Sequence, residues 1–267
     1  MKMNIVAGVD IGAGTAKAVI FIDGQITSYS VLPTGYDSVE AAKKTIEEAL
    51  KKAHILFSDL EQIVATGYSR SIVPFANKTM TEIMCHARGA SFLIPQAGTV
   101  IDIGCQDSKA IRLGERGKVT NFVMNDKCAA GTGRFIEVMA HALGLRIEEV
   151  GTVALTSKNH CEVSSTCTVF AETEIISQRA QGRKREDLIA GALKSIAKRV
   201  SVMASSIGLA KEVVFTGGVA KNIGVKKALE EALGMGIIVP EEPQIIGALG
   251  AALFANDELE QTSCGGS

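Results

Sequence analysis

One β-rich motif occurs twice in the chain, and this repeat limits the possible folds more than any other feature. Residues 7–21 read AGVDIGAGTAKAVIF, and residues 99–113 read TVIDIGCQDSKAIRL. Asp-Ile-Gly and Lys-Ala match at a constant offset of 92 (102 − 10 and 109 − 17). Chance repeats of three residues are common, whereas a strand, a turn and a lysine repeated together indicate a duplication. We therefore predict two similar domains that face each other across a cleft.

Two further pairs of segments support the duplication. Asp23-Gly24 follows the first copy and Arg116-Gly117 follows the second, each as a hairpin turn between strand-like runs. A weaker echo relates Ala-Thr-Gly-Tyr at residues 65–68 to Phe-Thr-Gly-Gly at residues 215–218.

The glycine-rich turn of each copy is expected to bind phosphate. It joins two strands, which argues against Rossmann and P-loop folds because both need a helix after the glycines. Small residues with free N–H groups still form a nest for anions, and an aspartate at a strand end can hold a metal ion directly or through water. The candidate residues are Gly12, Ala13, Gly14, Thr15, Ala16, Lys17 and Gly104 for phosphate, and Asp10 and Asp102 for Mg²⁺.

Two cysteines stand in similar surroundings. Cys128 lies among small residues before an amphipathic helix, and Cys167 lies among hydroxyl residues before a helix predicted from about Ala171 to Gln181. Free N–H groups and the helix dipole favour a thiolate at such positions. For Cys128 a small buried cysteine in a phosphate-type loop is an equally good interpretation of that stretch alone.

Composition narrows the class of protein. The 267 residues carry a formal charge of -1, which gives no case for nucleic acid or an anionic membrane as a partner. No signal peptide and no apolar run of spanning length are visible, so a cytoplasmic protein is expected. The six cysteines lack the spacing of a disulfide framework or a zinc site.

The expected organisation is a first domain over residues 1–96 and a second over residues 97–256. The second domain carries both cysteines, and its last helix is free to pack back on the first domain. Residues 257–267 form a polar tail that we expect to be disordered, so Cys264 is excluded from the chemistry.

The paired turns and the Thr-Gly-Gly segment resemble the actin, sugar-kinase and heat-shock chaperone superfamily of ATPases over about residues 5–255. This resemblance implies an α/β fold of two duplicated ribonuclease-H-like (actin-like ATPase) domains around a nucleotide cleft. NDKCAAGTGRF, SSTCTVFAE and DIGCQDSK resemble, more narrowly, the activator ATPases (component A) of 2-hydroxyacyl-CoA dehydratases and the ATPase subunits of benzoyl-CoA reductases. Cys105 departs from the pattern, because glycine is expected there.

The resemblance implies a homodimer that shares one 4Fe–4S cluster, with Cys128 and Cys167 of each chain as ligands. A cluster of this kind needs four thiolates, and a two-fold axis through it doubles the two that each chain supplies. ATP with Mg²⁺ would drive one electron, delivered by reduced ferredoxin or flavodoxin, into a partner dehydratase.

Further roles follow from position within this family. Asp10, Asp102 and Gln106 are the candidate catalytic residues, with Gln106 orienting the attacking water. The expected contacts to ribose and base are Gly217, Gly218, Ala220 and Gln244. Two other classes stay open: a small-molecule (sugar-type) kinase that uses one of the aspartates as a base, and a non-catalytic actin-like or chaperone nucleotide switch.

Overall fold

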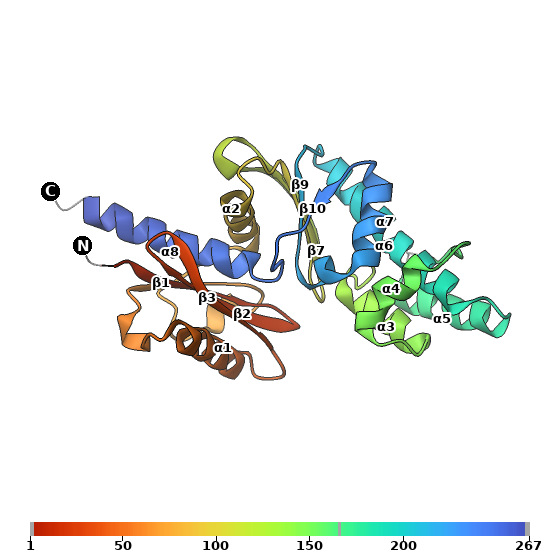
Figure 1. Cartoon of the computed structure of the whole chain (residues 1–267), viewed down its shortest axis with the longest axis horizontal. Coiled ribbons are helices and arrows are strands. Elements are labelled where there is room, and N and C mark those ends of the chain that lie inside the picture. Colours follow the sequence, from red (N-terminus) through yellow and green to blue (C-terminus); the bar gives the residue numbers. More distant parts are fainter. Residues whose placement is uncertain (1–2, 165–166, 265–267) are drawn as a thin grey trace. The chain divides into compact units, whose positions relative to one another are not determined.

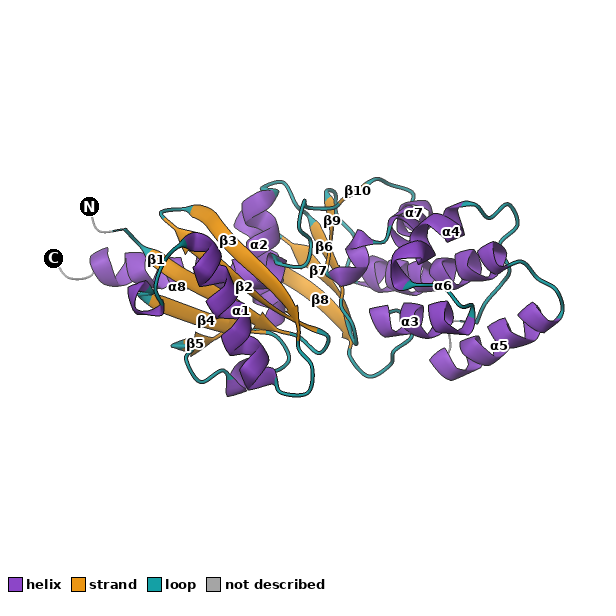
Figure 2. Cartoon of the chain, turned by 60° about the horizontal axis from the view of Figure 1, so that its bottom comes forward, coloured by secondary structure: helices purple, strands orange, loops and turns teal. Residues whose placement is uncertain are grey.

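A computed structural model describes residues 3–164 and 167–264 of the chain. It divides into two compact units, each built around one five-stranded sheet (Figures 1 and 2). The first unit comprises the residues up to Gln96, Gly114–Val119 and the residues from Gln244 onward, and the second comprises Ala97–Leu113 and Thr120–Pro243. Residues 244–256, expected in the second domain, thus belong with the first unit.

The sheet of the first unit has the strand order β3-β2-β1-β4-β5. Its strands are β1 (Ile5–Ile11), β2 (Thr15–Ile22), β3 (Gln25–Pro33), β4 (Gln62–Thr66) and β5 (Lys78–Thr79). β1, β2 and β3 pair antiparallel in chain order, whereas β4 runs parallel to β1 and to β5.

Helices cover both faces of this sheet. They are α1 (Ser38–Ala53), α2 (Glu82–Leu93) and α8 (Ile246–Cys264). Alternate side chains of a strand point to opposite faces, and the two faces of β1 accordingly enter different cores. Val9 and Ile11 pack with the apolar side of α1, and Val6 packs with α8. Figure 1 shows α1 and α8 on opposite sides of the sheet.

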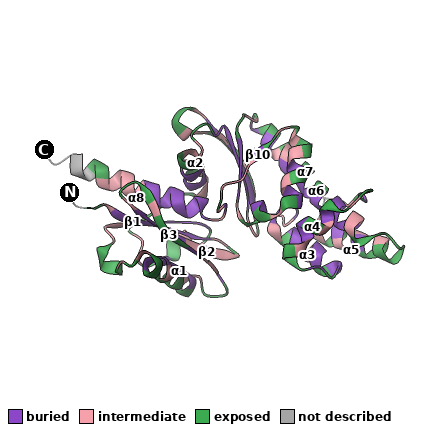
Figure 3. Cartoon of the chain, viewed as in Figure 1, coloured by how far each residue is buried: buried purple, intermediate pink, exposed green. Residues whose placement is uncertain are grey.

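Glycines, which carry no side chain, let the backbone of α8 contact the backbones of its neighbours. A Cβ on Gly8 of β1 would lie 2.0 Å from Ala248 O, and a Cβ on Gly250 of α8 would lie 1.8 Å from Cys85 O in α2. Real Cβ atoms do not approach other atoms so closely, so only glycine fits. The first half of α8 is consequently buried, whereas its second half becomes progressively exposed (Figure 3).

The helix α8 continues beyond Asn256, so the prediction of a disordered tail is wrong for residues 257–264. Two acidic residues of this stretch have partners in the first unit: Asp257 pairs with Arg88 at 3.1 Å, and Glu258 pairs with Lys78 and Gln62. The last three residues, 265–267, lie outside the described chain.

The second unit repeats the plan of the first. Its strands are β6 (Thr99–Ile103), β7 (Ser108–Leu113), β8 (Val119–Asn125), β9 (Val213–Thr216) and β10 (Ile237–Ile238). The order is β8-β7-β6-β9-β10, with β6 antiparallel to β7 and parallel to β9. Each strand therefore corresponds to one strand of the first sheet.

Five helices complete the second unit. They are α3 (Gly133–Ala142), α4 (Val150–Leu155), α5 (Thr168–Ala180), α6 (Arg185–Ser206) and α7 (Ile223–Leu233). α6 contacts each of the other four, and α3 packs on α5. Their apolar sides form one core with β6 and β9, in which Ile101, Phe215 and Met139 are fully buried.

The structure confirms the duplicated α/β fold. Asp10 is opposite Lys17 between β1 and β2, and Asp102 is opposite Lys109 between β6 and β7. The hairpin turns also agree, because both residues of each pair have positive φ: 46° and 84° at residues 23–24, and 56° and 72° at residues 116–117. Such a pair of left-handed residues is typical of a tight type I′ hairpin.

No helix in the described ranges has the length and hydropathy needed to cross a lipid bilayer.

Gly250→Ala should lower the free energy of unfolding by about 3 kcal/mol, because its Cβ would overlap the backbone of α2 and force two packed helices apart. Urea denaturation measures the change. Gly236→Ala is the matched control, since a Cβ there meets no atom within 4 Å. Equal stability of the two variants would contradict the packing described for α8.

Candidate functional site

The two glycine-rich turns have the same hydrogen-bonded geometry. In the first unit the N–H of Gly12 donates to Thr15 O at 3.1 Å, and in the second the N–H of Gly104 donates to Asp107 O at 2.9 Å. Each bond closes a tight turn with two residues at its tip, residues 13–14 and 105–106. Turns of this kind present backbone N–H groups together, as phosphate binding requires.

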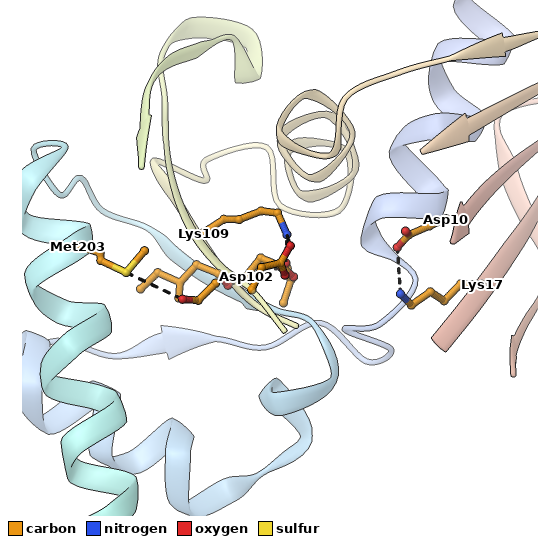
Figure 4. Close-up of polar contacts among 9 residues, drawn as sticks. Asp10, Lys17, Asp102, Lys109 and Met203 are labelled. Carbon is orange, nitrogen blue, oxygen red and sulfur yellow. Dashed lines mark hydrogen bonds and ion pairs between the residues drawn. The ribbon is translucent and has the colours of Figure 1, made fainter. Parts of the chain in front are cut away.

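A lysine faces the aspartate beneath each turn. Lys17 Nζ lies 3.1 Å from Asp10 Oδ2 in the first unit, and Lys109 Nζ lies 3.4 Å from Asp102 Oδ2 in the second (Figure 4). The side chain of Lys109 is 1% exposed. Both candidate Mg²⁺-binding carboxylates are therefore charge-compensated from the neighbouring strand.

Asp107 is a site residue that the sequence did not reveal. Its carboxylate forms an ion pair with Lys109 at 2.8 Å. The same carboxylate lies over Gly104, where a Cβ would be 2.7 Å from Oδ1. The first copy has Thr15 at the equivalent position, so the repeat itself gave no signal. The signal available in the sequence was an acidic residue, Asp107, two residues before Lys109, which is buried in the structure.

One glycine closes each site from the parallel strand. Gly67 follows β4 with φ +93°, and Gly217 follows β9 with φ +87°. A Cβ on Gly67 would lie 2.5 Å from Asp10 Oδ1, and one on Gly217 would lie 2.8 Å from Asp102 Oδ1. The weaker sequence echo thus reflects equivalent structure, with both glycines required by backbone conformation and by space.

The candidate contacts to ribose and base separate into two groups. Gly217, Gly218 and Ala220 lie together in the turn after β9, where Gly218 is exposed and Ala220 is buried. Gln244 belongs to the first unit. Gln106 is exposed at the tip of its turn, as a residue that contacts a nucleotide or water would be, and its role stays a prediction.

The structure places the two cysteines differently with respect to their helices. Cys167 is the N-cap of α5. Cys128 lies four residues before Thr132, the N-cap of α3, in a loop whose carbonyls at Cys128 and Ala130 accept hydrogen bonds from the side chain of Asn125 at 2.9 and 3.1 Å. The helix-start argument therefore applies directly to Cys167, whereas Cys128 is held by the loop.

Both thiols suit metal binding in their present form. Cys128 and Cys167 are free and partly exposed, whereas Cys85 and Cys161 are free but buried. Within residues 3–164 and 167–264, no group of three or more His, Cys, Asp and Glu side chains is arranged to hold a metal ion. One thiol lies in the loop before α3 and the other at the N-cap of α5, a helix that packs on α3. Two such thiols fit half of a four-thiolate ligand set.

Cys105 fits its turn without the expected glycine. Among the described residues other than glycine, positive φ occurs only at Asp23, His54 and Arg116, so the backbone at Cys105 is open to any side chain. It is partly exposed and forms no disulfide bond with the described residues.

Two α/β units with matching strand order, equivalent glycine-rich turns and buried aspartates define the fold of the actin and sugar-kinase type. A ROK family glucokinase from Streptomyces griseus shares this fold, with a TM-score of 0.58 at 14% identity over 95% of this chain and 99% of that one. The chain belongs to the BadF/BadG/BcrA/BcrD ATPase family, whose model matches residues 7–255.

Nearer relatives cover almost the whole chain. The (R)-2-hydroxyglutaryl-CoA dehydratase activating ATPase of Acidaminococcus fermentans is 47% identical over 250 residues, which are 93% of this chain and 95% of that protein. The solved activator of the 2-hydroxyisocaproyl-CoA dehydratase from Clostridium difficile, with bound ADPNP, superposes with a TM-score of 0.93 at 42% identity and covers 98% of both chains.

Lys109→Met should lower the free energy of unfolding by about 3 kcal/mol, because it leaves two carboxylates without the cation that compensates them in a buried site. Urea denaturation without nucleotide measures this loss. Lys17→Met is the internal control: Lys17 pairs with the carboxylate of Asp10 and its side chain is 12% exposed, so its loss should be smaller. The reverse order would contradict the electrostatic role assigned to Lys109.

The thiols should differ in reactivity. Burial raises the pKa of the Cys85 thiol to about 12, so the reactive thiolate is absent at neutral pH. In metal-free protein we expect iodoacetamide to modify Cys105, Cys128 and Cys167 and to leave Cys85 unmodified, as read by mass spectrometry of peptides. Modification of Cys85 at the rate of Cys128 in folded protein would contradict this assignment.

Proposed function

We propose that this protein is an ATP-dependent one-electron donor that activates a 2-hydroxyacyl-CoA dehydratase, using a 4Fe–4S cluster shared by two copies of the chain. The observation that carries the proposal is the pair of free, partly exposed thiols, Cys128 and Cys167, in the same unit as a phosphate turn. A kinase of this fold has no evident use for them.

The relatives support the dehydratase as partner. Proteins 43% and 47% identical to this chain over nearly its full length are named as a 2-hydroxyisocaproyl-CoA dehydratase activator and as a (R)-2-hydroxyglutaryl-CoA dehydratase activating ATPase. A third, 45% identical, is named an activator of lactoyl-CoA dehydratase. Since these acyl groups differ, the shared role lies in activation, and the acyl-CoA is recognised by the partner.

Each unit would contribute one turn to ATP. The backbone N–H groups of residues 12–16 and of Gly104 would hold phosphate oxygens, with Lys17 adding positive charge. Asp10 and Asp102 would hold Mg²⁺ and its waters, and Gln106, exposed at the tip of its turn, would orient the attacking water. The turn after β9, with Gly217, would face ribose and base.

Cys128 and Cys167 would be the cluster ligands of each chain. When bound, a 4Fe–4S cluster supplies a carrier for one electron. The N-terminus of α5 at Cys167 favours negative charge on the bound thiolate. Two thiols per chain require a second copy, so the functional form is a homodimer with its two-fold axis at these residues. Reduced ferredoxin or flavodoxin is the proposed electron source, in the cytoplasm.

Cys128→Ala should abolish iron binding, because it removes two of the four thiolates of the dimer. ATP affinity should stay unchanged, since the phosphate turns are intact. Iron content and visible absorbance of anaerobically purified protein, together with calorimetric titration of ATP, test both parts. Cys105→Ala is the matched control, a second partly exposed thiol of the same unit whose loss should leave iron binding intact.

Two results would contradict the proposal. Full iron content in Cys128→Ala would remove Cys128 from the ligand set. A wild-type protein that is colourless after anaerobic purification and transfers phosphate from ATP to a small molecule would be a kinase.

A further inference from the structure

The two phosphate turns are held by different partners, and this difference breaks the duplication. In the first unit the hydroxyl of Thr34 donates to Gly12 O at 2.8 Å, from just after β3. The equivalent carbonyl of the second unit is Gly104 O, because 104 − 12 is the repeat offset of 92. Its donor is the N–H of Gly133 at 2.8 Å, from the first residue of α3. The segment that carries Cys128 and leads into α3 thus provides, in the second unit, the donor that Thr34 provides in the first.

A second bond runs alongside the first. The N–H of Arg134 donates to Cys105 O at 2.8 Å, so both carbonyls at the start of the turn are bonded to the first two residues of α3. Free N–H groups at a helix start usually bond to a capping side chain or to water. The side chain of Thr132, the N-cap, makes no capping bond here. The carbonyls of the phosphate turn instead accept hydrogen bonds from two of the N–H groups at the start of α3.

Gly133 leaves little room for a side chain at this junction. A Cβ on it would lie 3.1 Å from Gly104 O, 3.4 Å from Cys105 Cα and 3.3 Å from Val219 Cγ2. Val219 follows the glycine pair after β9, so the phosphate turn, the turn proposed to face ribose, and α3 all meet at this one residue. A side chain here would require the turns or the helix start to move by a few tenths of an ångström.

The residues between Cys128 and Gly133 are held in place by hydrogen bonds and close contacts. The side chain of Asn125, at the end of β8, binds the carbonyls of Cys128 and Ala130. The N–H and hydroxyl of Thr132 both bond to Ala129 O, at 3.1 and 2.7 Å. The remaining residue, Gly131, has φ +93° with Arg199 Cδ 3.0 Å from where its Cβ would be. A shift of Gly133 is therefore passed on to Cys128.

We propose that Gly133 is a positioning residue that couples the phosphate turn of the second unit to the Cys128 loop. The inference rests on the proposed function, since it assigns nucleotide to the turn and a cluster thiolate to the loop. Movement of the turn when the phosphate chain changes would pull on the start of α3 through two backbone hydrogen bonds. In the first unit Gly12 O accepts from Thr34 instead, so the coupling to Cys128 runs from the turn of the second unit.

Two substitutions test the junction: one adds a side chain and keeps the N–H that donates to Gly104 O, and the other also removes that N–H. Gly133→Ala keeps the N–H but forces the helix start and the turn apart by a few tenths of an ångström, while alanine favours the helix. Gly133→Pro removes the donor at a first helical position, where proline is well accepted. Its ring also takes the place of the N–H hydrogen, so the turn must move away from the start of α3. Neither change is expected to unfold the unit, and Gly236→Ala, whose Cβ meets nothing, is the control.

The measurement is the rate at which a chelator removes iron from the anaerobically purified protein with Mg²⁺–ATP, with Mg²⁺–ADP and without nucleotide. We expect the ratio of the ATP rate to the nucleotide-free rate to differ from unity in the wild type and in Gly236→Ala. It should shift towards unity in Gly133→Ala and reach unity in Gly133→Pro, with iron content and calorimetric ATP affinity unchanged.

Several outcomes would overturn the inference alone: the wild-type ratio retained in Gly133→Pro, an equal loss in Gly236→Ala, a wild-type ratio of unity, or loss of ATP affinity in both Gly133 variants. The last would make Gly133 part of the binding turn. A wild-type protein without iron would instead reject the proposed function, and the inference with it.

Discussion

The cross-strand pairing of an aspartate with a lysine organises each half of this molecule. Asp10 and Asp102 lie at the ends of the central strands, are almost fully buried, and have their carboxylates within 3.4 Å of a lysine ammonium. A buried carboxylate is stable only when its charge is compensated. The lysine supplies that compensation from the next strand and fixes the register that closes the phosphate turn. An incoming cation and phosphate chain would therefore rearrange an existing charge network.

The same constraint explains the glycines around the site. Gly67 and Gly217 approach the carboxylates so closely that a Cβ would lie less than 3 Å away, and both have positive φ. Each central aspartate is thus enclosed by a lysine on the antiparallel strand and by a Thr-Gly turn on the parallel strand. This enclosure occurs in both units, which is why a short sequence repeat corresponds to a complete structural repeat.

The sequence could predict what depends on periodic or repeated local pattern. The duplicated strands, the hairpins at residues 23–24 and 116–117, and the helix over residues 38–53 were all predictable. Asp107 and Gly133 were not, because their roles arise where segments far apart in the chain meet in space. The order of residues 257–264 was missed for the same reason: a polar composition says nothing about Arg88 and Lys78, which pair with Asp257 and Glu258.

Departures from the repeat carry the information about what each unit does. Up to the end of the third strand the units share one strand order. Pro33 ends β3 and Asn125 ends β8 at the offset of 92, although the hairpin turns before them stand at an offset of 93 (116 − 23). The first unit then continues with Thr34, which bonds to its own phosphate turn. The second unit instead continues into the Cys128 loop, and α3 takes over that bond. Cys128, the proposed cluster ligand, therefore lies in the segment where the two units diverge. That segment is hydrogen-bonded to the glycine-rich turn of its own unit through the start of α3.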